Sequence, residues 1–175
     1  MGILASPFTN TDSGTQDRVR SPEEYGKFYK KIQIPSYYPD SISEYTVNSY
    51  YYAVEEHSEL CYEIFLDITV SESEFNTLLQ SVKSDGREKK IGTAYHSTEY
   101  LEIIFNNDYT PSYSYYGTVE NANIEKVIYN EAEGRIIFVL LYVGEDGIYG
   151  INEIEYFKKL KISYDKYTNG DNNKI

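Results

Sequence analysis

Hydrophobic and polar residues follow two patterns along this chain, one with a period of two and one with the period of a helix. The clearest period-two segment runs from Leu60 to Val70, where every second residue is large and apolar. It predicts a strand with one strongly apolar face. The segment from Glu44 to Val54 is rich in Tyr and Val, and the polar residues 55–58 separate it from the first segment. Together the two segments predict an antiparallel hairpin.

The helical pattern occurs twice, once before and once after this hairpin. Ser21 with Glu24, and Ser71 with Glu74, each match a capping box. Apolar residues then follow at helical spacing: Tyr25, Phe28, Tyr29 and Ile32 in the first segment, and Phe75, Leu78, Leu79 and Val82 in the second. We expect an early helix from Ser21 that ends before Pro35, and a short amphipathic helix over residues 72–83 laid on the sheet.

The second half of the chain predicts further strands and a closing helix. We expect a polar loop from Ser84 to Lys90 and a turn at Asn106–Asp108, and the residues 130–134 match a hairpin turn. The expected strands cover residues 98–105, 113–119, 124–129 and 135–143, and the expected helix covers residues 153–161.

This order of elements indicates the fold class and the domain organisation. Consecutive antiparallel strands with interspersed helices predict an α+β fold with two layers, in which helices lie mainly on one face. We expect a mostly antiparallel sheet of about five to six strands and two or three helices. Residues 1–20 are expected to be a polar lead or linker, 21–165 a single domain, and 166–175 a frayed tail.

The charge of the chain narrows the classes of partner. The net charge is −12 and the isoelectric point is near 4.6. A nucleic-acid binder needs basic residues that neutralise phosphates, so we expect no nucleic-acid partner, and adsorption to an anionic membrane is disfavoured for the same reason. No apolar run approaches the roughly 18 residues of a transmembrane helix. A basic protein partner, a bound cation or solubility alone would each fit this charge.

Catalytic motifs are missing from the sequence. No glycine-rich phosphate loop and no G-x-S-x-G elbow occurs, and both His57 and His96 lie in polar stretches. His57 and Cys61 have a spacing seen among zinc ligands, but a single pair does not make a zinc site. Cys61 lies in an apolar strand pattern between Glu59 and Glu63, which favours a buried, inert thiol. We therefore expect no enzyme, no cofactor and no metal site.

Tyrosine is the least ordinary feature of the composition, with 21 Tyr and no Trp. Two clusters, at residues 50–52 and 113–116, each place Tyr on both faces of a predicted strand. One face of each strand can belong to the core, but the other face must meet solvent, a helix or a partner. Exposed Tyr favours protein interfaces and stacking on sugars, although β-propensity alone also explains Tyr in strands. The candidate binding surface, for a protein or glycan partner, consists of Tyr50, Tyr51, Tyr52, Tyr113, Tyr115 and Tyr116.

Four stretches carry a resemblance: the run from Ile34-Pro35 through Tyr50-Tyr51-Tyr52, then Tyr62-Glu63-Ile64-Phe65-Leu66, then Ser71-Glu72-Ser73-Glu74-Phe75, and later Arg135-Ile136-Ile137-Phe138-Val139. Over residues 32–145 they resemble a group of uncharacterised small lipoproteins or membrane-anchored proteins of Gram-positive bacteria. The resemblance implies an extracytoplasmic location with a membrane anchor in the native form. It implies no catalytic residues, and the chain shows no lipobox cysteine.

Three functions stay open from the sequence. The first is a non-enzymatic binding or accessory domain of the bacterial cell envelope. The second is a cytoplasmic, acidic, immunity-type protein that neutralises a basic protein partner, which the net charge of −12 would suit. The third is an enzyme that uses His57 or His96 with a carboxylate, which would require a concave pocket around that histidine.

Overall fold

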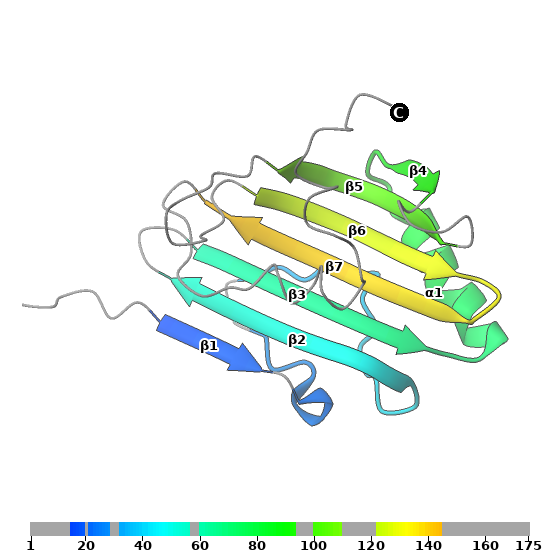
Figure 1. The fold of residues 1–175 in the computed structure, drawn as a ribbon, viewed down its shortest axis with the longest axis horizontal. Coiled ribbons are helices and arrows are strands. Elements are labelled where there is room, and N and C mark those ends of the chain that lie inside the picture. Colours follow the sequence, from blue (N-terminus) through cyan, green and yellow to red (C-terminus); the bar gives the residue numbers. More distant parts are fainter. Residues whose placement is uncertain are drawn as a thin grey trace, which may run out of the picture.

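The computed structural model describes residues 15–19, 21–28, 32–56, 60–93, 100–109 and 122–144. Within these ranges, seven strands form one antiparallel sheet in the order β1-β2-β3-β7-β6-β5-β4 (Figure 1). They are β1 (Thr15–Val19), β2 (Thr46–Glu56), β3 (Leu60–Thr69), β4 (Lys90–Thr93), β5 (Leu101–Tyr109), β6 (Ala122–Asn130) and β7 (Arg135–Val143). The helices in the same ranges are α1 (Glu72–Ser84) and a one-turn 3-10 helix at Pro22–Glu24. An α+β fold with an antiparallel sheet is therefore confirmed.

The two predicted hairpins are present, and the sheet joins them through its central strands. β2 pairs with β3, and β6 pairs with β7, in both cases antiparallel. β3 also pairs with β7, so that Phe65 lies opposite Val139. This central pairing joins segments that are far apart in the sequence. The strand predicted at residues 135–143 therefore lies in the centre of the sheet, between β3 and β6.

Both faces of the central strands are buried. One face, called here the helix face, packs against α1 and carries Tyr52, Ile64 and Phe138, each with at most 1% of its surface exposed. The alternate residues point to the opposite face, where Tyr51, Phe65 and Ile137 are equally inaccessible. Burial on both sides explains why β7 reads as a near-continuous apolar run rather than as a strict alternation.

Helix α1 forms as its sequence predicts. The Ser71 side chain accepts a hydrogen bond from the Glu74 backbone, and the Glu74 carboxylate accepts one from the Ser71 backbone, which completes the capping box. Its four apolar residues are all buried, and Phe75 meets the Tyr129 ring of β6 at 6.3 Å. No helix in the described ranges is long and apolar enough to span a membrane.

The predicted first helix is wrong in the described part of its range. The chain forms only the single 3-10 turn at Pro22–Glu24, and the Ser21 side chain makes no capping bond to the helix backbone. Gly26 follows with a φ of +87°, a left-handed conformation that ends the turn. Tyr25, in the turn just before Gly26, and Phe28, just after the turn, both lie against β2, where their rings meet those of Tyr50 at 5.4 Å and Tyr52 at 5.7 Å respectively.

The edge opposite β1 also differs from the expectation. The expected turn at Asn106–Asp108 lies inside β5, which pairs with β6 through a bulge between Ile104 and Asn106. Strand β4, which starts at Lys90 where we expected a loop to end, was not predicted at all. The sheet therefore has seven strands rather than about five to six, with one α-helix in the described ranges.

The remaining expectations concern the ends of the chain. Residues 15–19, placed by the sequence in a polar lead, form β1 and pair with β2. The expected strand at residues 113–119, the closing helix at 153–161 and the tail at 166–175 lie outside the described residues.

Candidate functional site

The predicted tyrosine surface is corrected where the structure describes it. Tyr50, Tyr51 and Tyr52 are 3%, 2% and 0% exposed, so all three are core side chains rather than a surface. Tyr50 and Tyr52 belong to the core under α1, and Tyr51 is buried on the opposite face. The other members of that surface, Tyr113, Tyr115 and Tyr116, lie outside the described residues, as do His57 and His96.

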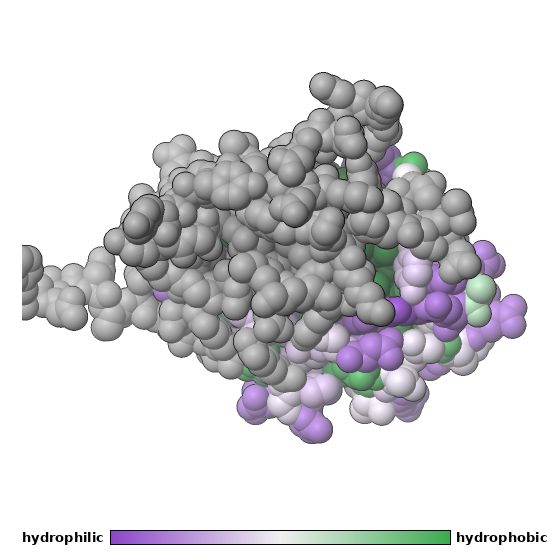
Figure 2. Space-filling model, viewed as in Figure 1, coloured by the Kyte–Doolittle hydropathy of each residue, from purple (hydrophilic) through white to green (hydrophobic). Residues whose placement is uncertain are grey.

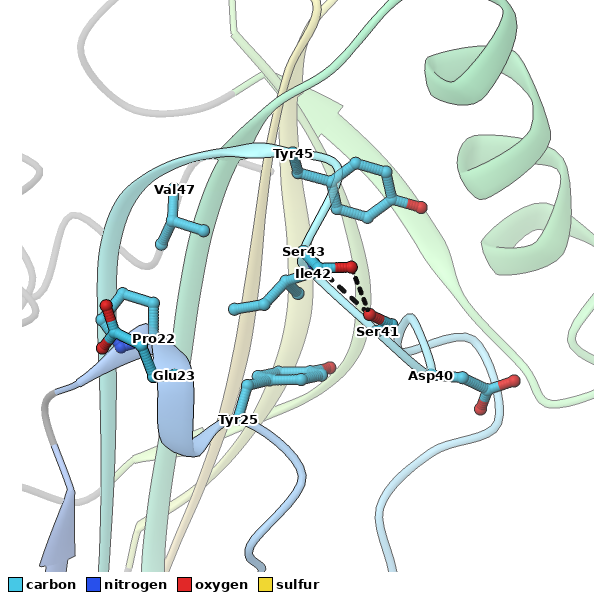
Figure 3. Close-up of a pocket in the computed structure, with 9 residues that line it drawn as sticks. All are labelled: Pro22, Glu23, Tyr25, Asp40, Ser41, Ile42, Ser43, Tyr45 and Val47. Atoms are coloured by element: carbon cyan, nitrogen blue, oxygen red, sulfur yellow. Dashed lines mark hydrogen bonds between the residues drawn. The ribbon is translucent and has the colours of Figure 1, made fainter.

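The described chain instead presents a cleft on the helix face that sequence reasoning missed. Residues 39–45, called here the ridge, run between two adjoining hollows of about 450 and 510 Å³. Both volumes fall in the range of roughly 300–1,000 Å³ that small-ligand sites occupy. The first hollow, drawn in Figure 3, is lined by Pro22, Glu23, Tyr25, Asp40, Ser41, Ile42, Ser43, Tyr45 and Val47. The second is lined by Ser36, Tyr37, Tyr38, Pro39, Asp40, Ser41, Ser43, Glu44, Tyr45, Thr77, Leu78 and Ser81.

Backbone and side-chain contacts hold the ridge in place. The Tyr25 hydroxyl donates to the Pro39 carbonyl at 2.7 Å, which ties the 3-10 turn to the start of the ridge. Ile42 is 5% exposed and anchors the middle of the ridge in the core. The Ser41 and Ser43 hydroxyls are 3.0 Å apart, and the Tyr45 amide donates to the Ile42 carbonyl at 3.2 Å. A cleft built on such a fixed segment loses little conformational entropy when a ligand binds.

The charged residues that line the cleft in the described part of the chain all have one sign. They are Glu23, Asp40 and Glu44, and no described Lys or Arg lines either hollow. Asp40 and Glu44 are exposed and have no ion pair with any described residue. Partial burial, with the nearby carboxylates of Glu74 and Glu44, raises the pKa of the Tyr45 phenol.

Tyr38 lines the second hollow and lies almost wholly inside the protein. Its ring packs against Tyr37 and Phe138 at centroid distances of 5.6 and 5.0 Å, and it is 6% exposed. Its hydroxyl has no hydrogen-bond partner among the described residues. A buried hydroxyl without a partner is uncommon and carries a desolvation cost, so it calls for a physical reason. Burial also raises the pKa of this phenol well above its usual value.

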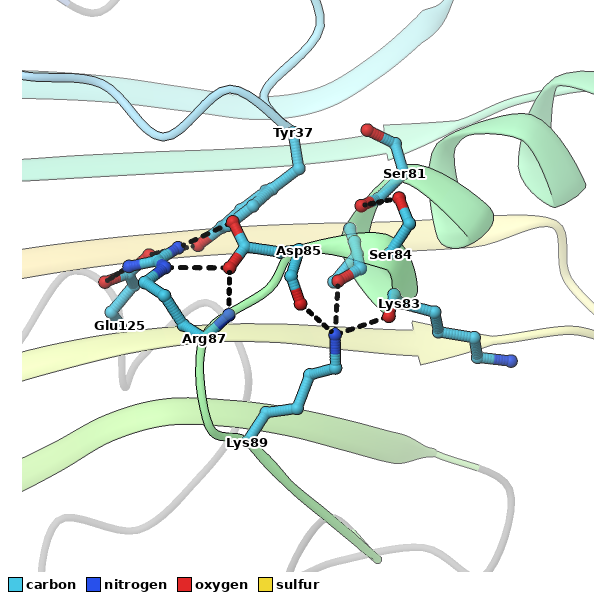
Figure 4. Close-up of polar contacts among 9 residues, drawn as sticks. Tyr37, Ser81, Lys83, Ser84, Asp85, Arg87, Lys89 and Glu125 are labelled. Atoms are coloured by element: carbon cyan, nitrogen blue, oxygen red, sulfur yellow. Dashed lines mark hydrogen bonds and ion pairs between the residues drawn. The ribbon is translucent and has the colours of Figure 1, made fainter.

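A polar cluster next to the cleft fastens the end of α1 to the sheet (Figure 4). The Arg87 guanidinium donates to both carboxylate oxygens of Glu125, at 2.8 and 2.7 Å, and also to Asp85 at 2.9 Å. The Tyr37 hydroxyl donates to Glu125 at 2.6 Å. The Arg87 guanidinium also lies 4.5 Å from the Phe105 ring centroid. These bonds lower the pKa of Asp85 and raise that of Arg87, so both of these side chains stay charged at neutral pH.

A second polar cluster lies at the end of β3 and β7. Arg135 donates to both oxygens of Asp67, at 3.0 and 2.7 Å, and to the Tyr100 hydroxyl at 3.0 Å. Asn48 donates to Asp67 at 3.0 Å. Asp67 is 4% exposed, and a buried carboxylate requires such pairing. This cluster is a structural tie between strands.

The described residues contain no group of three His, Cys, Asp or Glu side chains placed to hold a metal ion. Cys61 is 5% exposed, and the Gly144 amide lies 3.5 Å from its sulfur. The burial predicted for this thiol is therefore confirmed. Figure 2 shows that hydrophilic side chains predominate where described residues form the visible surface, with hydrophobic ones scattered between them.

Comparisons with protein-family models, with curated proteins and with solved structures find no match for this chain. The indications of its function therefore come from its own residues, above all from the cleft around residues 39–45.

Proposed function

We propose that this protein is a non-enzymatic binding domain of the bacterial cell envelope that holds a protein partner in the cleft around residues 39–45. The observation that carries the proposal is the cleft itself: two open hollows of about 450 and 510 Å³ share the side chains of one fixed ridge. Aromatic walls give contact area at a low cost in side-chain entropy, and polar groups along the rim give specificity.

The protonation chemistry of the cleft supports binding rather than catalysis. A general acid or base works best when its pKa lies near the working pH. The pKa of Tyr25 and that of Tyr45 are both raised above the ordinary phenol value, so both groups stay neutral and retain their protons at neutral pH. Such groups keep a proton with which to form hydrogen bonds but exchange protons poorly.

The envelope location is supported by the resemblance of residues 32–145 to anchored proteins of Gram-positive bacteria. The proposal also keeps the two-layer arrangement expected from the sequence, with α1 and the ridge forming the second layer over the sheet. A second candidate is a cytoplasmic, acidic, immunity-type protein that neutralises a basic partner. The carboxylate rim of the cleft favours this candidate as well, because it would attract a basic surface in either compartment.

Two measurements on intact source cells test the proposal. Protease added outside the cells should cleave the protein, and the protein should fractionate with the membrane. Protection from protease together with a soluble fraction would remove the envelope location and leave the immunity-type candidate.

A photo-reactive amino acid placed at Ser41 tests the use of the cleft. It should form a crosslink to a single protein species, whereas the same group at Lys90, on the far edge of the sheet, should not. Equal crosslinking from both positions, or none from Ser41, would contradict binding through the cleft.

A further inference from the structure

We infer that the cleft recognises an arginine side chain, presented by a basic segment of the partner protein. This inference rests on the proposed function, because it names the chemistry of the partner at the same site. Asp40, Ser41, Ser43 and Tyr45 line both hollows, so one extended segment laid across the ridge would meet the same side chains from both sides.

The carboxylates of the cleft are complementary in charge to a basic segment. The described charged side chains that line the cleft are three carboxylates, and Asp40 and Glu44 form no ion pair with any described residue. The whole chain has a net charge of −12, which adds a long-range attraction for a basic segment. A phosphate or another anion would be repelled at the same rim.

The protein's own Arg87 shows how a guanidinium is held in this fold. Arg87 lies over the Phe105 ring at 4.5 Å while Glu125 and Asp85 accept its hydrogen bonds. The cleft lining contains the same kinds of group, the aromatic ring of Tyr45 and the carboxylates of Asp40 and Glu44. Figure 3 shows the Tyr45 ring at the side of the hollow that faces α1. A planar guanidinium can stack on such a ring and bond to carboxylates at its edge, whereas the compact ammonium of lysine cannot do both equally well.

The Tyr38 hydroxyl is also suited to an arginine. Tyr38 lines the second hollow and is 6% exposed, and its buried hydroxyl has no hydrogen-bond partner among the described residues. A phenol oxygen accepts hydrogen bonds, and arginine carries five N–H donors. With the Tyr38 side chain turned toward the hollow, an arginine there would give the hydroxyl a partner that it lacks among the described residues.

The test uses the full chain and a labelled hexa-arginine peptide as the probe, with binding followed by fluorescence anisotropy. The neutral peptide hexa-citrulline keeps the shape of the side chains but removes their charge. Hexa-arginine should bind, hexa-citrulline should bind at least about tenfold more weakly, and hexa-lysine should lie between them.

Matched variants separate the cleft from general attraction to an acidic protein. The double change Asp40→Asn and Glu44→Gln should weaken hexa-arginine binding about tenfold or more, and Tyr45→Leu should weaken it several-fold. Glu88→Gln with Glu131→Gln changes the net charge equally at exposed residues outside the cleft lining, so affinity should stay within about twofold. Tyr38→Phe should weaken binding without loss of stability.

The outcomes distinguish this inference from the proposed function. Equal losses in the cleft and control double variants, or equal binding of hexa-citrulline, would overturn the arginine site. If a partner still crosslinks from Ser41 in that case, the binding function stands with a different partner chemistry. If hexa-arginine binds as expected but no partner crosslinks from Ser41 in cells, the recognition chemistry stands and the proposed function falls.

Discussion

Tyr37 and Tyr38 are neighbours in the sequence and both are buried, yet their hydroxyls have different surroundings. The Tyr37 hydroxyl donates to the Glu125 carboxylate at 2.6 Å, in the cluster that also holds Arg87. The Tyr38 hydroxyl has no partner among the described residues, although its ring packs between Tyr37 and Phe138. Both rings are buried against aromatic neighbours, so removing one hydroxyl at a time isolates the hydrogen bond that Tyr37 makes.

Removing each hydroxyl in turn should therefore give opposite results. Tyr37→Phe should lower the free energy of unfolding by about 1–2 kcal/mol, because it deletes a hydrogen bond to a charged acceptor. Tyr38→Phe should leave that free energy unchanged or raise it slightly, since it removes a desolvated group and keeps the ring. Urea unfolding followed by circular dichroism measures both. Equal destabilisation by the two variants would show that Tyr38 has a hydrogen bond in solution.

At the scale of elements, the turn between β6 and β7 depends on a glycine. Gly134 has a φ of +60°, and a Cβ atom added there would lie 2.7 Å from the Val70 carbonyl oxygen. Val70 directly follows β3, and its backbone amide also donates a hydrogen bond to the Gly134 carbonyl at 3.0 Å. The turn therefore couples the two hairpins of the sheet as well as closing one of them.

Gly134→Ala should lower the free energy of unfolding by about 2 kcal/mol or more, from the left-handed backbone and the clash with Val70. Gly86→Ala is the matched control, because Gly86 has no positive φ and open space around its Cα. It should be neutral or stabilise the protein by up to about 1 kcal/mol by restricting the unfolded chain. Similar melting temperatures for the two variants would contradict this account of the turn.

The elements that the sequence predicts well are those set by short-range signals. Helix α1 follows from a capping box at Ser71 and a helical apolar face, and both features are local. The segment after Ser21 carries equally good local signals, but its described residues form only one 3-10 turn. Tyr25 and Phe28 instead pack on the rings of Tyr50 and Tyr52 in β2, contacts that no local pattern reveals. An aromatic pair three residues apart suits one face of a helix, but here the turn at Gly26 lies between the two residues and both rings pack on β2.

The cleft was missed for the same reason. Its walls come from the 3-10 turn, the ridge and α1, which only the folded chain brings together. The sequence signals that could have indicated it are Pro35 and Pro39, which disfavour a helix in this segment, and the polar run at residues 40–44 around the single apolar residue Ile42. The Tyr50–Tyr52 prediction was wrong because it required one face of β2 to be open, whereas both faces of this strand are buried.

For the whole molecule, the many buried phenols link stability to alkaline pH. The pKa values of Tyr25, Tyr37 and Tyr38 are all raised, chiefly because burial disfavours the charged phenolate. In the unfolded chain the same phenols lose their protons near their ordinary pKa of about 10. Above that pH the folded state binds more protons than the unfolded state, so the free energy of unfolding falls as the pH rises. Below pH of about 10 this contribution to stability is complete.

The titration should therefore be biphasic. The chain has 21 Tyr and no Trp, so its near-ultraviolet absorbance reports phenol ionisation directly. Exposed phenols should ionise near pH 10, and the buried ones only at higher pH, together with the loss of the sheet signal in circular dichroism. In the double variant Tyr37→Phe with Tyr38→Phe, stability should fall less steeply above pH 10, because two of the linked groups are gone. Ionisation of all the phenols in one step near pH 10, with the circular dichroism unchanged, would mean that the core admits phenolate ions and would contradict the burial that defines this fold.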